Sequence, residues 1–291
     1  MTSIKCKGAV VVNAYWRGGD EGALAISDAL SHMGISAPLV KASDLFMRVD
    51  EGAKGNAPFD FAVYLDKDDA VARLLEAKGV RLFNSAESIR LADDKMLTHI
   101  ALLRAGIRQP KTIPSPLFFA GEDDGSFIDQ VGRELGFPVV VKKCYGAFGK
   151  QVYLARNAEE LRALREKLLP EKHLYQEFID CGATDLRIIV IGGKAVAAMR
   201  RRAASEGEFR ANAELGGTGE RIELTKEIAE TAEKAAAALG LCYAGVDLLE
   251  KGGEYLLAEV NSNAHFALIR KVTGVNVAEV YAAYIAREMK K

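Results

Sequence analysis

The sequence lacks any apolar run long enough to cross a lipid bilayer, which takes about 20 consecutive apolar residues. Its first residues, MTSIKCKGAVVV, also lack the long apolar core and the small-residue cleavage site of a secretory signal peptide. The sequence contains only four cysteines, and no two of them are spaced as a CxxC pair: Cys6, Cys144, Cys181 and Cys242. This scatter argues against a zinc site or a disulfide framework and predicts free thiols. We therefore expect a cytoplasmic protein.

An excess of charge of either sign is also missing. The chain carries 39 lysines and arginines against 40 aspartates and glutamates, a formal net charge of −1. The composition therefore predicts binding neither to nucleic acid nor to an anionic membrane. Hydrophobic residues make up 49% of the chain, which is ordinary for a globular protein, and 291 residues allow about two domains of average size.

The first part of the chain alternates between strand and helix patterns. Buried strands are predicted for the apolar segments 8–14, 59–65 and 80–84. Helices that stop at a glycine are predicted for segments 22–34 and 70–79. Strands separated by helices indicate a small parallel α/β domain. Its binding edge would be formed by the loops after the strands, residues 13–17 and 66–68.

The remainder of the chain predicts an α+β arrangement. Residues 85–106 have the pattern of one helix, or of two helices that meet near Asp93 and Asp94. The proline-rich passage RQPKTIPSP, residues 108–116, is the predicted linker into a second unit. Hairpins are predicted at Gly192-Gly193 and at Gly252-Gly253.

The hairpin of residues 244–261 carries the clearest chemistry. Strand alternation predicts a core face made of Val246, Leu248, Ala258 and Val260. It predicts a second face made of Asp247, Leu249, Leu257, Glu259 and Asn261. Two carboxylates and an amide oxygen on one face are suitable ligands for Mg²⁺, completed by water and substrate phosphates. The alternative is that Asp247 and Glu259 are strand-end carboxylates in solvent.

A second group of residues is suited to phosphate and nucleotide binding. Lys142 ends the apolar segment VVVK, just before a loop that contains Gly146 and Gly149, so its amine can reach a phosphate cradled by the loop. The alternative is a tight turn, and the ending GK[ST] of a Walker A motif is absent. Glu177 and Phe178 lie where a strand is expected to leave its sheet, a place suited to an adenine edge and a ribose.

Arginines further along the chain provide forks for phosphate oxygens. Asp185 and Arg187 occur in TDLR, and Arg210 and Asn212 in EFRAN. Of the three consecutive arginines at 200–202, at least two are expected to form a solvated strand end.

Taken together, these motifs resemble those of a known family. VVVK and GAFG, QEF, DLR, FRAN, GVDLL and EVN occur in this order, at spacings similar to those of the ATP-grasp superfamily. Within it, the chain resembles the RimK-like branch of α-L-glutamate ligases, whose founding member adds glutamates to the C-terminus of a ribosomal protein. DDK at residues 93–95 and RQPKT at 108–112 are also similar to that branch. The resemblance covers residues 85–291 strongly and the N-terminal domain more loosely.

The resemblance implies an ATP-grasp fold in three parts. These are an N-terminal parallel α/β domain at 1–84, a linker helix and a central lid-like subdomain at 85–176, and a C-terminal subdomain at 177–291 that carries the metal site. ATP would be held between the last two. The implied reaction is an ATP-dependent joining of a carboxylate and an amine through an acyl phosphate. Its substrates would be an amino acid, such as glutamate, and a peptide, protein tail or metabolite that carries the carboxylate.

The resemblance also assigns roles to residues, motif by motif. Contacts with ATP are implied for Lys95, Lys142, Gly146, Gly149, Glu177, Phe178, Asp185, Arg210, Ala211 and Asn212. Arg210 and Arg187 would act on the transferred phosphoryl group, and Asp247, Glu259 and Asn261 would hold Mg²⁺, or Mn²⁺ in its place. Dimers or tetramers are common among such ligases, so a homo-oligomer is expected.

The sequence departs from the branch directly after Asn261. Many members continue with a small residue, proline and glycine, whereas this chain reads SNAHF at residues 262–266. We predict that Asn263, His265 and Arg17 contact the acceptor substrate, with a hydrogen-bonded structural role as the alternative for His265. Two other functions stay open, a ligase of free amino acids of the dipeptide or D-alanine type, and an ATP-binding regulator without turnover.

Overall fold

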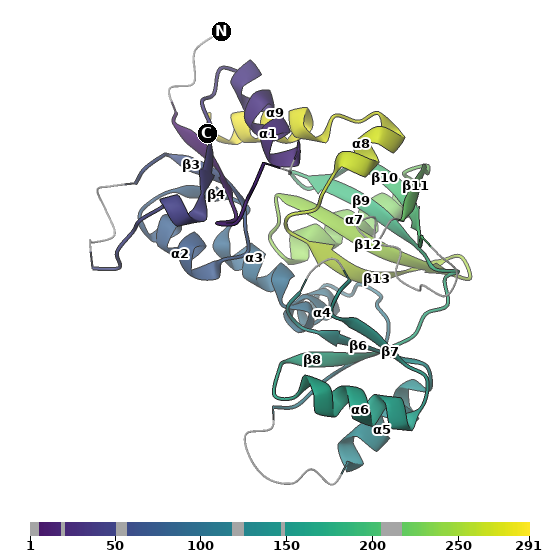
Figure 1. The fold of residues 1–291 in the computed structure, drawn as a ribbon. Coiled ribbons are helices and arrows are strands. Elements are labelled where there is room, and N and C mark those ends of the chain that lie inside the picture. Colours follow the sequence, from purple (N-terminus) through teal and green to yellow (C-terminus); the bar gives the residue numbers. More distant parts are fainter. Residues whose placement is uncertain (1–5, 19–20, 51–56, 118–124, 147–148, 205–216) are drawn as a thin grey trace.

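The computed structural model describes residues 6–18, 21–50, 57–117, 125–146, 149–204 and 217–291. Within these ranges the chain forms a four-stranded parallel sheet, a four-stranded antiparallel sheet and a five-stranded antiparallel sheet. Figure 1 shows the parallel sheet and the five-stranded sheet at the upper end of the molecule, with the other sheet below them. The predicted α/β class, with α+β character in the C-terminal half, is confirmed.

The N-terminal sheet has the predicted parallel topology, with the strand order β2-β1-β3-β4. Its strands are β1 (Gly8–Val12), β2 (Leu39–Lys41), β3 (Phe61–Leu65) and β4 (Arg81–Phe83). The helices between them are α1 (Glu21–His32), the short 3₁₀ helix η1 (Ala42–Asp44) and α2 (Asp69–Ala77). The sequence pattern had not indicated β2, because three residues are too few to show alternation.

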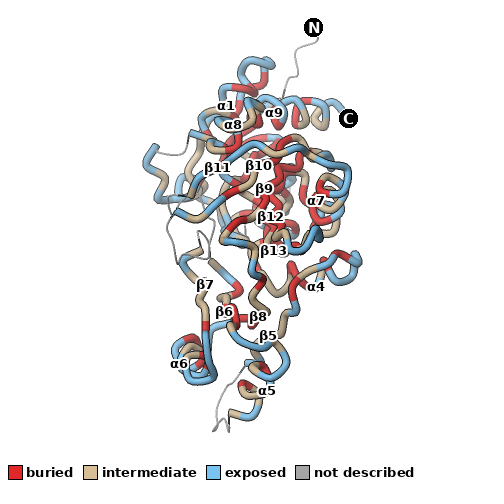
Figure 2. The backbone as a smooth tube through the Cα atoms, turned by 90° about the vertical axis from the view of Figure 1, so that its right-hand side faces the viewer, coloured by how far each residue is buried: buried red, intermediate tan, exposed pale blue. Residues whose placement is uncertain are grey.

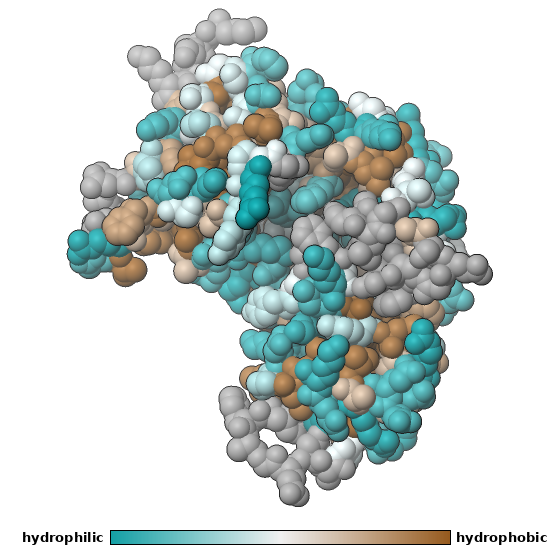
Figure 3. Space-filling model, in the orientation of Figure 1, coloured by the Kyte–Doolittle hydropathy of each residue, from teal (hydrophilic) through white to brown (hydrophobic). Residues whose placement is uncertain are grey.

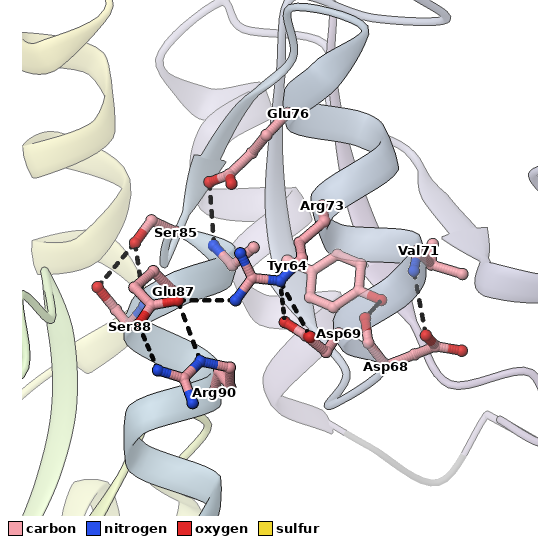
Figure 4. A network of polar contacts seen from close by, with 11 residues as sticks. Tyr64, Asp68, Asp69, Val71, Arg73, Glu76, Ser85, Glu87, Ser88 and Arg90 are labelled. Atoms are coloured by element: carbon pink, nitrogen blue, oxygen red, sulfur yellow. Dashed lines mark hydrogen bonds and ion pairs between the residues drawn. The ribbon is translucent and has the colours of Figure 1, made fainter. Parts of the chain in front are cut away.

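A polar network joins α2 to the next helix, α3 (Ala86–Asp93) (Figure 4). The Asp68 carboxylate accepts a hydrogen bond from the Val71 backbone N–H and so caps the start of α2. Arg73 on α2 donates to Glu87 on α3 over 2.7 Å. The Glu76 carboxylate accepts a hydrogen bond from the backbone N–H of Ala86. These contacts fix α3 against the N-terminal sheet.

Residues 85–106 form two helices that meet at Asp94, which was one of the two arrangements predicted from the sequence. The second, α4 (Lys95–Arg104), begins directly after Asp94, whose carboxylate accepts hydrogen bonds from the backbone N–H groups of Met96 and Leu97. The cap ends one helix and starts the next, and it places Lys95 at the first position of α4.

The central unit is an antiparallel sheet with the strand order β5-β8-β6-β7. Its strands are β5 (Thr112–Pro114), β6 (Val139–Lys143), β7 (Val152–Ala155) and β8 (His173–Glu177). Helices α5 (Ser126–Leu135) and α6 (Ala158–Leu168) pack on it and share a separate hydrophobic core with the sheet. The passage 108–116 is therefore more than a linker, because part of it pairs with β8 as an edge strand, where proline costs no ladder hydrogen bond.

The C-terminal sheet is antiparallel, with the strand order β11-β10-β9-β12-β13. Its strands are β9 (Thr184–Ile191), β10 (Lys194–Arg202), β11 (Thr218–Arg221), β12 (Tyr243–Lys251) and β13 (Glu254–Asn261). Helix α7 (Lys226–Ala238) covers one face, and α8 (Ala267–Thr273) and α9 (Val277–Glu288) follow the last strand. Figure 2 shows buried backbone concentrated in β9, β10 and β12.

A β-bulge in the hairpin of β12 and β13 corrects the predicted faces. Asp247 pairs with Glu259 as expected, but the register then shifts, so that Leu248 pairs with Leu257. Leu257 is consequently buried in the core under α7, while Ala258 lines a pocket on the opposite face. Simple alternation had assigned these two residues the other way round, because a bulge inserts one residue and reverses the parity beyond it.

The N-terminal sheet and the C-terminal elements share one hydrophobic core. Val10 and Phe61 of the parallel sheet belong to the same buried cluster as Ile189 of β9 and Tyr281 of α9. The views in Figures 1 and 2 agree in placing α1 beside α9. The two ends of the chain therefore fold against each other, whereas the central unit has its own core.

Asn84 joins these two ends by hydrogen bonds. Its side-chain amide donates to the carbonyls of Tyr243 and Ser262, and its oxygen accepts from the backbone N–H groups of Cys242 and Tyr243. One buried side chain thus connects the end of β4, the start of β12 and the segment after β13.

No helix in the described part of the chain is long and apolar enough to cross a membrane. On the face drawn in Figure 3, hydrophilic residues cover most of the surface and hydrophobic residues form separate patches.

Candidate active site between two sheets

A pocket lies between the central sheet and the C-terminal sheet, and we call it the inter-sheet pocket. Residues singled out from the sequence line it: Lys95, Lys142, Gly146, Gly149, Glu177, Phe178, Asp185, Asp247 and Glu259. Apolar residues from both sheets complete the lining, Val140 and Val152 on one side and Leu249 and Ala258 on the other. The structure therefore brings together groups that lie more than 160 residues apart in the sequence.

Two lysines enter the pocket from the central side. Lys95 Nζ donates a hydrogen bond to the Gly146 carbonyl over 3.0 Å and lies 3.4 Å from Glu259 Oε1. Lys142 lies at the end of β6, where burial lowers the pKa of its amine to about 8, although nearby Glu259 opposes that shift. Two cations directed at one cavity are suited to a polyanionic ligand.

Gly146 has a steric reason to be glycine. Its φ is +144°, and a Cβ at this position would lie 2.5 Å from Gln151 Oε1. The backbone that carries the Lys95 contact therefore needs a residue without a side chain.

Carboxylates and arginines alternate on the site face of the C-terminal sheet. The strand register places Arg187 of β9 beside Asp247 of β12, which in turn lies beside Glu259 of β13. Arg187 donates to both oxygens of Asp247, with Nη2 2.9 Å from Oδ2. Arg201 of β10 also reaches Asp247 over 2.9 Å and binds both oxygens of Asp185 over 2.7 and 2.6 Å.

Burial and the two guanidinium groups act in opposite directions on these acids. Burial raises the pKa of Asp185 to about 6, even though Arg201 favours its charged form. Burial also opposes ionisation of Asp247, but Arg187 and Arg201 together hold its pKa below the usual value. For Glu259, burial again opposes ionisation, but Lys95, Lys142 and Arg187 together outweigh it, so its pKa is lowered. Asp247 and Glu259 are therefore charged near neutral pH.

Arg201 is the residue that sequence reasoning missed at this position. Its side chain is only 2% exposed, whereas Arg200 is half-exposed and pairs with Glu250, and Arg202 is exposed. The expectation that at least two of the three arginines form a solvated strand end fits this arrangement. Strand parity could have separated Arg201 from its neighbours, but the register of β10 against Asp185 was not visible in the sequence.

The donor atoms on this face fit a magnesium ion. Asp247, Glu259 and Asn261 share one face of the hairpin, because Asp247 pairs with Glu259, and Gly245 pairs with Asn261 two residues along. Among the described residues, no group of three His, Cys, Asp or Glu side chains could hold a metal alone. Mg²⁺ characteristically uses one or two carboxylates and takes its other ligands from water and phosphate. Glu259 and Asn261, with Asp247 beside them, match that requirement.

The structure does not place all of the predicted site residues in a pocket. Arg210, Ala211 and Asn212 are outside the described residues. Arg17 is exposed in the loop after β1 and does not line either pocket described here.

The side chain of Glu177 already has a backbone partner, since its Oε1 accepts a hydrogen bond from the Lys111 N–H over 2.9 Å. This contact ties the pocket wall to the start of the central sheet.

A buried polar chain behind the pocket was also missed. His99 of α4 contacts Gln109 Oε1 through Nδ1 over 2.6 Å and Gln176 Nε2 through Nε2 over 3.2 Å. Burial lowers the pKa of His99 to about 4, and Lys142 adds to the shift. A neutral imidazole with the proton on Nδ1 satisfies both contacts. Gln176, which lines the pocket, is thereby held from behind.

A second pocket of about 570 Å³ lies where α1 begins opposite the segment after β13, and we call it the α1–α8 pocket. Asn263 and His265 line it as residues of that segment, and the side chain of Asn263 donates to the Leu65 carbonyl over 2.9 Å. The opposite wall is the first turn of α1, and the loop 13–17, predicted as part of the binding edge of the N-terminal domain, does not line this pocket.

The two pockets are neighbours through Gly245. A Cβ on Gly245 would lie 2.3 Å from Ala264 Cβ and 3.4 Å from Arg187 Cδ. Ala264 lines the α1–α8 pocket, while Arg187 binds Asp247 of the inter-sheet pocket. One strand position therefore separates the two cavities.

Comparisons with known proteins agree with this architecture. The "Probable alpha-L-glutamate ligase" of Psychromonas ingrahamii is 39% identical over 226 residues, which cover 76% of this chain and 72% of that protein. A RimK domain protein ATP-grasp from Sphaerobacter thermophilus has the same fold, with a TM-score of 0.74 at 21% identity, over 96% of this chain and 98% of that one. The D-alanine–D-alanine ligase of Bacillus anthracis, complexed with ATP, gives a TM-score of 0.74 at 20% identity over 98% and 99%.

The family assignment comes from the sequence itself. Residues 92–285 match the RimK-like ATP-grasp domain, and this range contains the inter-sheet pocket and the whole of its arginine–carboxylate row. The chain belongs to the RimK-like ATP-grasp family and is an ATP-dependent ligase.

Proposed function

We propose that the protein joins a carboxylate to an amine at the expense of ATP, through an acyl phosphate. The observation that carries the proposal is the inter-sheet pocket, where two lysines face a row of ionised carboxylates between two sheets. Its apolar walls suit a base, and its charged end suits phosphates with a bound cation. The names of the relatives suggest that the amine belongs to an amino acid, with glutamate as one candidate.

The reaction would proceed in two balanced steps. A carboxylate oxygen attacks the γ-phosphorus of ATP, which gives an acyl phosphate and releases ADP. The amine, after its ammonium form has lost a proton to solvent, then attacks the acyl carbon, inorganic phosphate leaves, and the nitrogen loses a further proton to solvent as the amide forms. The first nucleophile needs no general base, because a carboxylate is already ionised at neutral pH.

The chain's own residues would hold and neutralise the phosphates. Lys142 and Lys95 offset phosphate charge from the central side, while Gly146 lets the backbone approach closely. A magnesium ion held by Glu259 and Asn261 would offset the remaining charge when bound. Arg187, which binds Asp247 and lies close to Gly245, would contact the phosphoryl group as it passes to the acceptor.

The amino acid substrate would occupy the α1–α8 pocket. This pocket adjoins the inter-sheet pocket at Gly245, so its occupant would lie near the γ-phosphate end of the nucleotide. Asn263 and His265 line it and stay our candidates for substrate contacts. Arg17, which the structure leaves exposed in the loop after β1, remains a weaker candidate for the acceptor's carboxylate.

Phosphate release from ATP tests the function. The full-length protein with ATP and Mg²⁺ is given amino acids singly and in pairs, with and without short peptides, and the product is identified by mass. We expect amino-acid-dependent release of ADP and phosphate in equal amounts, together with a product linked by a new amide.

The Glu259→Gln variant separates an enzyme from a regulator that only binds ATP. Loss of the carboxylate should reduce turnover by at least about 100-fold, because removal of a group that stabilises transferred charge typically costs that much. Binding of ATP, measured directly, tests whether the variant still forms the pocket. A wild-type protein that binds ATP tightly but forms no product with any amino acid or peptide would contradict the proposal.

A further inference from the structure

The α1–α8 pocket has an apolar floor, two polar rim groups, and two polar side chains that already donate to backbone carbonyls, Asn263 to Leu65 and Tyr243 to Ala264. Its floor consists of Ala23, Ile26, Leu65, Ala264 and Phe266. All of these except Leu65 are buried in the shared core of the molecule, so the floor is rigid. Glu21, at the start of α1, and His265, before α8, are exposed at the rim.

The charges on this lining are unlike those that an acidic side chain needs. Among the described residues that line the pocket there is no lysine and no arginine, and His265 is the side chain that can carry a positive charge. Glu21 contributes a negative charge. A carboxylate placed on the apolar floor would lose its water without gaining a lysine or arginine from the described lining residues, which is strongly unfavourable.

The groups of a bound amino acid can be assigned one by one. Its ammonium fits the Glu21 carboxylate, and its α-carboxylate fits an imidazole N–H of His265. Most of the lining that then remains for the side chain is the apolar floor. We infer that the α1–α8 pocket takes an amino acid with an uncharged, aliphatic side chain, and that it discriminates against glutamate. This inference rests on the proposed ligase function, and it departs from the substrate in the names of the relatives.

The cavity is large enough for an amino acid, so the charge of its lining, and not its size, would select between leucine and glutamate. About 570 Å³ lies within the usual range for small-molecule sites and leaves room for an amino acid as large as leucine. Ala267, the first residue of α8, is exposed at the rim, so a larger side chain can be introduced there without disturbing the core.

Binding and turnover are measured separately. Radiolabelled leucine and glutamate are tested by equilibrium dialysis against the full chain with a non-hydrolysable ATP analogue and Mg²⁺. Alanine, valine, leucine, aspartate and glutamate are compared by ATP-dependent phosphate release. We expect leucine to bind at least tenfold more tightly than glutamate, and the aliphatic amino acids to give at least tenfold higher kcat/KM.

Three variants and one control locate the effect. Ala267→Phe should abolish leucine binding by filling the pocket, whereas Ala283→Phe, at an exposed position of α9, should not. Glu21→Gln should weaken leucine binding at least tenfold without changing binding of the ATP analogue. Ala267→Lys should move the preference towards glutamate by supplying the missing cation.

The outcomes distinguish this inference from the proposed function. Glutamate binding or turnover equal to that of leucine would overturn the inference and leave the ligase function standing. Leucine binding that Ala267→Phe abolishes, without phosphate release from any amino acid, would support the inference and count against the ligase function. Absence of binding by every amino acid tested, or leucine binding that Ala267→Phe leaves unchanged, would overturn the inference.

Discussion

Arg201 and Arg200 are adjacent in the sequence, and their surroundings give them different physical roles. Arg201 is buried between two carboxylates, Asp185 and Asp247, and binds both. Arg200 is half-exposed and pairs with Glu250 over 2.9 Å. A buried charge depends on its partners, whereas an exposed pair is screened by water.

Replacing Arg201 should therefore cost far more than replacing Arg200. Arg201→Met leaves the Asp185 carboxylate without its cation and Asp247 with Arg187 alone, and we expect the free energy of unfolding to fall by about 3–5 kcal/mol. Arg200→Met is the matched control, with an expected loss of about 1 kcal/mol or less. Chemical denaturation measures both. Equal losses in the two variants would show that Arg201 is not the buried anchor described here.

His99 predicts a pH dependence of stability. Its pKa is about 4 in the folded protein, against about 6.5 in an unfolded chain, because burial disfavours the charged form. Between these values the unfolded state binds more protons than the folded state. The stabilising contribution of neutral His99 to the free energy of unfolding is therefore complete above about pH 6.5 and is lost as the pH falls towards 4.

The size of that effect can be isolated with a variant. We expect His99 to account for about 3 kcal/mol of unfolding free energy lost between pH 7 and pH 4. The difference between wild type and His99→Gln, measured at each pH, removes the contribution of Asp185, whose raised pKa acts in the opposite direction. His32→Gln, at an exposed position of α1, is the control and should leave the profile unchanged. A parallel pair of profiles for wild type and His99→Gln would refute the assignment.

Among the secondary-structure elements, β9, β12 and β13 position the charged residues of the candidate site. Their register aligns Arg187, Asp247 and Glu259 across the sheet, and the bulge after Asp247 lets Ala258 line the same pocket as Leu249. The segment after β13 then folds back over Gly245, where only a glycine leaves room for Ala264. Backbone geometry thus couples the inter-sheet pocket to the α1–α8 pocket.

Gly245→Ala tests this coupling. The added methyl group would lie 2.3 Å from Ala264 Cβ, so the segment that lines the α1–α8 pocket must shift. We expect KM for the amino acid to rise at least about tenfold, while the dissociation constant of ATP changes less than about threefold. Gly219→Ala in β11 is the control, since its nearest contacts, at 3.2 and 3.3 Å, are to Met199 and Leu268 side chains that can move. Equal effects on both substrates would contradict the coupling.

At the scale of the whole molecule, the cores divide the chain differently from its order in sequence. The N-terminal sheet shares a core with β9 and α9, whereas the central sheet forms a core with α5 and α6 alone. The inter-sheet pocket lies on the boundary between these two bodies. The predicted domain boundary near residue 84 therefore stays a prediction. Because the central unit has its own core, we expect this unit to move independently of the rest.

Hydrogen exchange tests that division. We expect amides of β1, β9 and α9 to open with one common free energy, and those of β6 and β8 to open separately with a lower one. Addition of a non-hydrolysable ATP analogue with Mg²⁺ should protect both β6 and β12, because the ligand would bridge the two bodies. A single exchange free energy for all five elements would argue against separate bodies.

Local patterns in the sequence predicted most of the helices and strands, and its motifs predicted which residues line the candidate site. Strand and helix patterns predicted the parallel sheet and both glycine hairpins, and motif order placed Lys142, Asp185, Asp247 and Glu259 in one family pattern. These features are local, because periodicity and turn chemistry act over a few residues. The motifs name the residue types that a site needs, but they do not specify which of these residues contact each other.

The tertiary structure alone decided which groups contact each other. The bulge that exchanges Leu257 and Ala258, the burial of Arg201 and the pairing of His99 with Gln109 and Gln176 all depend on register and on packing between distant segments. The same holds for the α1–α8 pocket, which the first turn of α1 and the residues after β13 form together. Such contacts are set by the packing of whole elements, and no pattern within either segment specifies its partner.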